Sequence, residues 1–458
     1  MSITNRTVRT VAPETNKQHE WEVYSRQLPV EYRQSMEEGK DIAALQPLFE
    51  AIAGMENGPH KEAMADILHD MVVNAPIRPD YPYDEPSGLA EIRAARRPYP
   101  VQGEVPAGET LRDKIAGAWY GRICGCMLGK PVEGCRRYDL IPFLQETGNY
   151  PMHRYILKAD VEGRTLQKYQ YTFWSRAYAD TVACAPVDDD TNYVVLAQRM
   201  IRKYGRDFTP EDMMNAWLEL QSRNAYCTAE RVAYRNFING FRPPYSAAYK
   251  NPYREWIGAQ IRGDYFGYIN PGNPEMAAEM AWRDACISHV KNGIYGEMFA
   301  AAMIACAAVT DNIRDIILGG LAQIPATSRL HEQITKMVDM WDNGATEAEA
   351  VAHITGMYDD RNGHDWCHTI SNALVVTASL LYGGGDYSRS ICIAVENGFD
   401  TDCNGATVGS ILGMRGGKGC IDPYWLAPVR GMLDTSIFGS GRCDIEKLID
   451  RTMAHMAE

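Results

Sequence analysis

Four glycines at four-residue spacing are the feature that most restricts the fold of this chain. Gly117, Gly121, Gly125 and Gly129 fall on one strip of the helix that the apolar pattern predicts here. Glycine inside a helix costs roughly 1 kcal/mol relative to alanine, so a repeated strip indicates that another backbone lies very close. A membrane-spanning GxxxG dimer is excluded by the length of the segment and by the charge of Arg122. We therefore expect close helix packing at the centre of an all-α domain.

The chain from Leu111 onward has the pattern of a multi-helix domain, and alternating strand patterns are almost absent. Apolar residues recur at three- and four-residue spacing over 191–204, 210–220, 275–309, 345–357, 366–382 and 401–413. The preceding part differs, because two short amphipathic stretches, Ile42–Ala53 and Lys61–Val73, are followed by proline-rich runs that cannot continue a helix. We predict an arm of short helices and extended segments over residues 1–110, packed on one compact helical domain over 111–458.

Charge and composition limit the partners of the protein. With 46 basic and 59 acidic side chains the formal net charge is −13, which argues against nucleic-acid binding through a broad basic surface. The longest apolar stretch, Met298 to Val309, is shorter than the roughly 20 residues of a bilayer crossing, and the N-terminus has no signal-peptide core. Twelve cysteines without a CxxC pair are typical of buried thiols. We expect a cytoplasmic protein without nucleic-acid or membrane partners, and the oligomeric state stays open.

Two acidic clusters each come directly before an apolar helix. Asp188, Asp189 and Asp190 precede the first helix, and Asp400 and Asp402 precede the second. Acidic residues cap helix N-termini, but one or two suffice for a cap. Three consecutive aspartates repel one another, and their oxygens are the ligands that Mg²⁺, Mn²⁺ or Ca²⁺ prefers. The clusters are therefore either helix caps or parts of a cation site.

Three segments in this order resemble the ADP-ribosylglycohydrolase family, which includes the dinitrogenase-reductase-activating glycohydrolases. They are GAWYGRICGCMLGKPVEG at 117–134, DDDTNY at 188–193 and GFDTDCNGATVGSILG at 398–413. The resemblance covers about residues 111–417. It implies an all-α domain with a site for one or two Mg²⁺ or Mn²⁺ ions, acting on a small or protein-attached ribosyl or ADP-ribosyl substrate.

The resemblance also implies roles for individual residues. It places metal ligands at Asp188, Asp189, Asp190, Asp400, Asp402 and Cys403. The family's glutamate after the glycine-rich helix falls on Glu133, and we assign catalytic roles to Glu133 and Asp402. The chain departs from the family at three positions. Asp188 stands where threonine or serine is usual, Cys403 replaces a threonine ligand, and the usual Gly-Asp-Ala reads Gly125-Cys126-Met127. A thiol is a poor partner for a hard cation, so one of the metals is expected to bind more weakly.

Three further residues are assigned to substrate binding. Arg262 lies in a segment that resembles the family's arginine-containing loop, and it either binds a phosphate bidentately or forms an ion pair with Asp264. Tyr265 either stacks on a nucleobase or belongs to the core. Asn404, at the end of the second acidic cluster, is the third residue assigned to substrate binding.

Hydrolysis at an anomeric carbon needs an activated water on one face of the sugar and help for the leaving group on the other. The sequence therefore predicts a metal-dependent glycosidase that cleaves an N- or O-glycosidic bond of a ribosyl or ADP-ribosyl group. Two alternatives remain open. One is a hydrolase of small nucleosides or other glycosides. The other is a non-catalytic protein that binds ADP-ribose or a nucleotide, in which Cys126 and Cys403 mark lost chemistry.

Overall fold

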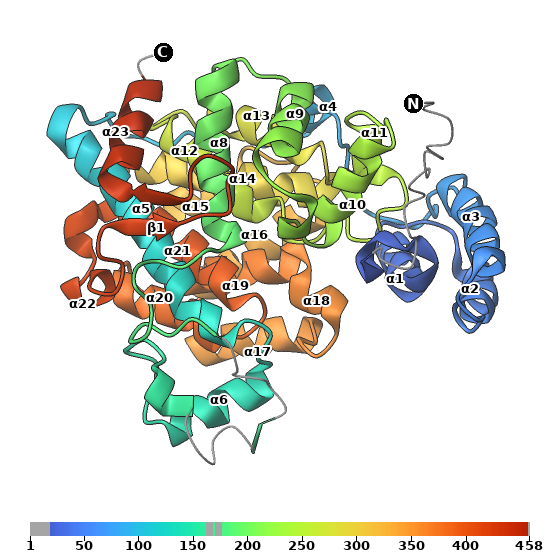
Figure 1. Ribbon diagram of the computed structural model, residues 1–458, viewed down its shortest axis with the longest axis horizontal. Coiled ribbons are helices and arrows are strands. Elements are labelled where there is room, and N and C mark those ends of the chain that lie inside the picture. The colour runs from blue at the N-terminus through green and yellow to red at the C-terminus, as the bar shows by residue number, and fades with distance from the viewer. Residues whose placement is uncertain (1–18, 162–167, 170–175, 457–458) are drawn as a thin grey trace, which may run out of the picture. The chain divides into compact units, whose positions relative to one another are not determined.

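The structure is a computed structural model of the chain, and it describes residues 19–161, 168–169 and 176–456 (Figure 1). The chain divides into two compact units, Met1–Pro79 and Asp80–Glu458. Almost every described element is a helix, and the prediction of an all-α fold is confirmed. No described helix combines the length and the apolar character that crossing a membrane requires.

The described residues of the smaller unit, 19–79, form three α-helices and three short 3₁₀ turns around a core of its own. Its elements are η2 (Glu20–Glu22), η3 (Tyr24–Arg26), α1 (Leu28–Glu37), η4 (Ala43–Leu45), α2 (Gln46–Ala53) and α3 (Pro59–Val73). Each α-helix has a proline in its first turn, where the missing N–H has no intrahelical partner to lose. Buried Leu28, Phe49 and Leu68 belong to one apolar cluster, so the two amphipathic stretches of the sequence become helices that share this core.

The larger unit contains the other described helices and one antiparallel pair of strands. Its α-helices are α4 (Leu89–Ala94), α5 (Gly108–Gly129), α6 (Arg137–Glu146), α8 (Asp189–Tyr204), α9 (Pro210–Leu220), α10 (Thr228–Ile238), α11 (Tyr245–Ala248), α12 (Asp264–Tyr268), α13 (Pro274–Ala285), α14 (Lys291–Ala307), α15 (Ile313–Leu321), α16 (Arg329–Asp342), α17 (Glu347–Met357), α18 (Gly363–Cys367), α19 (Thr369–Tyr382), α20 (Tyr387–Glu396), α21 (Thr401–Gly416), α22 (Pro423–Leu426) and α23 (Ile445–His455). The 3₁₀ turns are η5 (Lys130–Val132), η6 (Lys158–Val161), η7 (Arg223–Ala225), η8 (Gln260–Arg262) and η9 (Lys418–Cys420). Strands β1 (Met432–Asp434) and β2 (Arg442–Asp444) pair with Leu433 opposite Cys443.

Helices α5 and α21 cross the centre of the larger unit side by side (Figure 1). Their glycines pair in antiparallel order: Gly117 with Gly413, Gly121 with Gly409, and Gly125 with Gly405. A methyl group on Gly125 would lie 2.0 Å from the Gly405 carbonyl oxygen, which no real contact allows. The close backbone approach expected from the glycine strip is confirmed. Its consequence is that the C-terminal end of α5 meets the N-terminal end of α21, where the Thr401 hydroxyl donates to the Gly129 carbonyl over 2.9 Å.

The proline-rich segment from Asp80 groups with the larger unit, whereas the sequence analysis placed it in the N-terminal arm. An extended segment forms few backbone hydrogen bonds within itself, so its contacts with other elements determine which unit it joins. Glu85 forms an ion pair with Arg329 over 2.9 Å, and the Trp282 indole donates to the Ser87 carbonyl over 2.9 Å. The segment is thus held by polar contacts to α13 and α16.

Candidate active site

Side chains from α5, α8 and α21 form one buried cluster of possible metal ligands. One triad consists of Cys126, Asp188 and Asp190, and a second consists of Asp190, Asp402 and Cys403. Within each triad the sulfur and carboxylate oxygen atoms all lie within 4.8 Å of one another. Asp190 belongs to both triads. The two acidic segments, which are far apart in the sequence, therefore form a single site.

The helix starts explain why these residues lie where they do. Asp188 is the N-cap of α8, and its Oδ1 accepts the backbone N–H of Asp190 over 2.9 Å. Asp400 is the N-cap of α21, and its backbone N–H donates to Asn372 Oδ1 over 3.1 Å. Both clusters thus occupy helix N-termini, where the macrodipole stabilises negative charge. The capping interpretation and the cation interpretation are compatible, because a cap uses one carboxylate oxygen of Asp188 only.

A buried arginine fixes the orientation of Asp190. Arg122 on α5 is 1% exposed and donates to Asp190 Oδ1 over 3.0 Å and to Asp264 Oδ2 over 2.7 Å. The other carboxylate oxygen, Asp190 Oδ2, is buried and has no hydrogen-bond partner in the described part of the chain. A buried carboxylate oxygen without a partner is costly, and a bound cation is one partner that removes this cost. The donor set therefore fits a divalent cation at Asp190.

Electrostatic repulsion inside the cluster is strong. Burial, and then repulsion from neighbouring carboxylates, raises the pKa of Asp189 and the pKa of Asp402 well above their ordinary values. Burial also raises the pKa of Asp190, although Arg122 acts in the opposite direction. The pKa of Asp400 is raised by burial as well. Without a cation, the cluster therefore retains protons that free carboxyl groups have lost at the same pH.

Glu133 lies at the edge of the cluster, directly after α5 and η5. Its side chain is 39% exposed, whereas Asp188, Asp190, Asp400 and Asp402 are buried. Partial burial, followed by repulsion from Asp400 and Asp188, raises the pKa of Glu133 to about 7, while Lys130 and Arg176 act in the opposite direction. A carboxyl group with a pKa near 7 can accept or donate a proton at neutral pH.

The family comparison agrees with this site. The sequence model of the ADP-ribosylglycohydrolase family matches residues 107–458. The chain belongs to the ADP-ribosylglycohydrolase family. The match contains α5, α8, α21 and Glu133, and it leaves out the smaller unit. Among solved structures, the chain is similar to an ADP-ribosylglycohydrolase-related protein complex, with 17% identity, 76% of this chain and 99% of that chain covered, and a TM-score of 0.45. None of the curated proteins matches the chain.

Lys130 is the basic residue that pairs with Asp188 in this member of the ADP-ribosylglycohydrolase family. Its ammonium group forms an ion pair with Asp188 Oδ2, and its side chain is 22% exposed. The ion pair offsets the charge that Asp188 adds. Lys130 and Arg122, which contact the acidic cluster, were not among the site residues expected from the sequence. The available signal was their position, because each is a basic residue within or directly after a buried, glycine-rich helix.

Arg262 forms ion pairs inside the protein and is not placed to bind a phosphate, but its partners are Glu230 and Asp284 and not the expected Asp264. It is 1% exposed, and it donates to Glu230 over 3.1 Å, to Asp284 Oδ2 over 3.1 Å and to the Ser288 hydroxyl over 3.0 Å. Its two remaining N–H groups donate to the backbone carbonyls of Gly258 and Asp284. All five N–H groups of the guanidinium are therefore used inside the protein, and none is left for a substrate.

Tyr265 and Asn404 are also fully buried, at 0% exposure. The Tyr265 hydroxyl makes a 2.7 Å hydrogen bond with His455 Nδ1, and its ring packs edge-on against Trp119, which fits the core alternative. Asn404 donates to Asn372 Oδ1 over 2.8 Å, the same oxygen that accepts the backbone N–H at the start of α21. Asn404 thus supports the position of the second acidic cluster.

Proposed function

We propose that the protein is a metal-dependent hydrolase that cleaves an N- or O-glycosidic bond at the anomeric carbon of a ribosyl or ADP-ribosyl group. Membership of the ADP-ribosylglycohydrolase family supports a hydrolase of the ADP-ribose type. The observation that carries the proposal is Asp190, which is shared by two ligand triads and keeps a buried carboxylate oxygen without a protein partner. If the aspartates served only as helix caps, a buried carboxylate oxygen without a partner would have no purpose.

Asp188, Asp190 and Asp402 would hold one or two Mg²⁺ or Mn²⁺ ions, with Asp189 and Asp400 adding negative charge at the helix starts. When bound, such a cation lowers the pKa of a water molecule and orients hydroxyl groups of the sugar. Cys126 and Cys403 give each triad one sulfur, and sulfur suits a transition metal better than Mg²⁺. We therefore expect Mn²⁺ to bind more tightly than Mg²⁺.

The residues of this chain supply the remaining parts of the reaction. Glu133, accessible and with a pKa of about 7, accepts a proton from the attacking water or positions the ribose diol. Asp402 fixes the site from the α21 side, because its Oδ1 accepts the backbone N–H of Cys403 over 3.1 Å. Arg122 keeps Asp190 oriented toward the cluster. The oxocarbenium-like transition state is positive, and the surrounding carboxylates stabilise it.

Product release from a small panel tests the function. The panel contains ADP-ribosyl-arginine, ADP-ribosyl-serine, free ADP-ribose and simple ribonucleosides, each with Mg²⁺, Mn²⁺ or EDTA. We expect at least one member to be cleaved with a metal and none with EDTA. Cleavage of ribonucleosides alone would favour the nucleoside-hydrolase alternative. No cleavage combined with tight ADP-ribose binding would favour the non-catalytic alternative, and the proposal would then be wrong.

Cation affinity is expected to increase with pH. Because the pKa values of Asp189, Asp190, Asp402 and Glu133 are raised, the metal-free cluster holds protons near neutral pH, and a cation must displace them. Each displaced proton strengthens binding by up to about tenfold per pH unit. Calorimetric titration with Mn²⁺ from about pH 6 to 8, in two buffers of different ionisation enthalpy, counts the protons released. Affinity that does not change with pH, without proton release, would contradict this electrostatic description.

We also propose that the protein works in a reducing compartment such as the cytoplasm. All twelve cysteines are free thiols, and nine of them are buried. Burial raises the pKa of Cys126 and the pKa of Cys403 well above the ordinary thiol value, so both remain thiols in the metal-free cluster. In an oxidising compartment the exposed thiols of Cys227 and Cys420 would be open to oxidation.

A further inference from the structure

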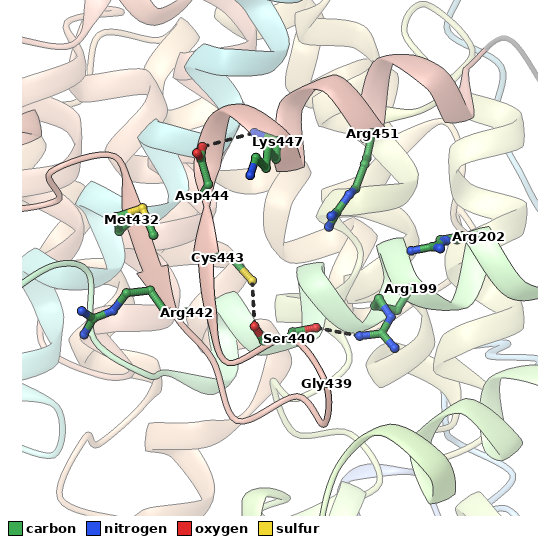
Figure 2. Close-up of a pocket in the computed structure, with 10 residues that line it drawn as sticks. All are labelled: Arg199, Arg202, Met432, Gly439, Ser440, Arg442, Cys443, Asp444, Lys447 and Arg451. Atoms are coloured by element: carbon green, nitrogen blue, oxygen red, sulfur yellow. Dashed lines mark hydrogen bonds between the residues drawn. The ribbon is translucent and has the colours of Figure 1, made fainter.

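A pocket lies toward the C-terminal end of α8, away from the acidic cluster, where this helix meets the β1–β2 hairpin and α23 (Figure 2). Its volume is about 470 Å³. The charged residues that line it are Arg199, Arg202, Arg442, Lys447, Arg451 and Asp444. Five cations and one carboxylate thus meet on a chain whose net charge is −13. Arg199 follows Asp190 by nine residues, about 14 Å along the helix axis, so this pocket is separate from the acidic cluster.

Nearby acidic groups neutralise only part of this charge. Arg442 forms a bidentate pair with Asp434 over 2.7 and 2.9 Å. Asp444, the one carboxylate in the pocket, caps α23 by accepting the backbone N–H of Glu446 over 3.0 Å. Arg199 donates to the Ser440 hydroxyl over 2.8 Å, which orients the guanidinium and leaves its charge in place (Figure 2).

Four cations in the pocket have no ion-pair partner among the described residues, and of these only Arg199 has a side-chain hydrogen bond: Arg199, Arg202, Lys447 and Arg451. They come from two different helices, and Figure 2 shows Arg451 and Arg202 extending on the same side as Arg199. Basic residues are favoured in the last turn of a helix, which accounts for Arg202 in α8 but not for Arg451, which lies near the middle of α23. Nor does it account for Lys447, which lies in the first turn of α23, where the helix dipole disfavours a cation.

We propose that this pocket binds a small anion that carries two or more phosphate groups. The guanidinium groups of Arg202 and Arg451 offer paired N–H donors that match phosphate oxygens, and Lys447 adds a point charge. A single phosphate would leave much of this charge unbalanced. None of the described residues that line the pocket is aromatic, so it lacks a surface on which a nucleobase could stack. The phosphate chain, and not a base, is therefore the recognised chemistry.

Calorimetric titration of the full chain with inorganic triphosphate tests this site. EDTA is present throughout, so that the cation cluster and metal–phosphate complexes do not contribute. We expect binding that weakens as salt is added, and at least about tenfold weaker binding in the double variant Lys447→Gln/Arg451→Gln. The control is Lys336→Gln on the exposed face of α16, which removes one positive charge outside the pocket. This variant is expected to bind triphosphate like the wild type.

Two further ligands test the chemistry. Inorganic phosphate is expected to bind at least about tenfold more weakly than triphosphate, and ATP is expected to match triphosphate within about threefold, because a base adds no contact. The proposal is overturned if the wild type does not bind triphosphate, if the double variant binds it equally, or if ATP binds far more tightly. If circular dichroism shows that the double variant is unfolded, the single variant Arg202→Gln, at an exposed position, replaces it. Weaker triphosphate binding by this variant supports the proposal, and unchanged binding overturns it.

Discussion

Replacing Asp402 by asparagine is expected to lower kcat/KM for the cleaved ribosyl substrate by about a thousandfold, which corresponds to roughly 4 kcal/mol of transition-state stabilisation. Asp402 is 2% exposed and supplies one ligand atom to the triad with Asp190 and Cys403. Asparagine has the same shape and can still accept the Cys403 N–H, but its amide is a much weaker ligand for a divalent cation. The measurement is the rate of product release with Mn²⁺.

The same variant is expected to be at least as stable as the wild type when no cation is present. The pKa of Asp402 is raised, so at neutral pH its ionised form is less favourable in the folded chain than in the unfolded chain. A neutral asparagine removes this unfavourable term. Thermal unfolding in EDTA should therefore show a melting temperature that is equal or higher. This separates loss of the site from loss of the fold.

Added Mn²⁺ should then distinguish the two proteins. A cation at about a hundred times its Kd stabilises the wild type by about 2.7 kcal/mol, and the variant should gain much less. Asp339→Asn on the exposed face of α16 is the matched control, with the same chemical change outside the cluster. Asp402 is a better choice than Asp190, because Asp190 also pairs with buried Arg122 and its loss would affect the fold. Full activity in Asp402→Asn would show that the acidic clusters are helix caps only.

Much of this site could be predicted from the sequence, because its parts lie in short motifs at helix ends. The glycine strip predicted a close helix partner, and the acidic residues before α21 mark the start of that partner. The helical spacing of apolar residues predicted the all-α fold class without any information on tertiary contacts. Both kinds of inference use spacing along one helix, which the chemistry of the backbone determines locally.

Pairings between distant segments could not be predicted in this way. Arg262 and Arg122 are both basic residues beside possible partners, yet only the fold shows that Arg262 uses every N–H internally and that Arg122 holds Asp190. From the sequence, Asp264 was the ion-pair partner considered for Arg262 because it is a near neighbour, whereas Asp264 pairs with Arg122 from another helix. Burial decides such cases, because an ion pair in the interior depends on which helices meet and in what rotation.

The second large effect is expected for Gly125→Ala, which should destabilise the folded protein by about 3 kcal/mol. The added methyl group would lie 2.0 Å from the carbonyl oxygen and 2.5 Å from the carbonyl carbon of Gly405. Both atoms belong to helix backbone, so no side chain can rotate away, and α5 and α21 must separate. Chemical denaturation measures the change. Gly356→Ala in α17 is the control, because a methyl group there meets nothing within 4 Å. The control is expected to be neutral or up to about 1 kcal/mol more stable, since alanine favours the helix.

Comparison with Gly117→Ala connects this packing to the proposed site. At Gly117 a methyl group would lie 2.2 Å from the Gly413 carbonyl oxygen, so a similar loss of stability is expected. Gly117 is about 12 Å farther along α5 from the cluster than Gly125, and Gly125 is next to Cys126. Separation at Gly125 moves the ligand triads apart, whereas separation at Gly117 acts at the opposite end of the helix pair. Mn²⁺ affinity should therefore fall sharply in Gly125→Ala and much less in Gly117→Ala. Equal affinities in the two variants would mean that the glycine contacts hold the fold without setting the geometry of the site.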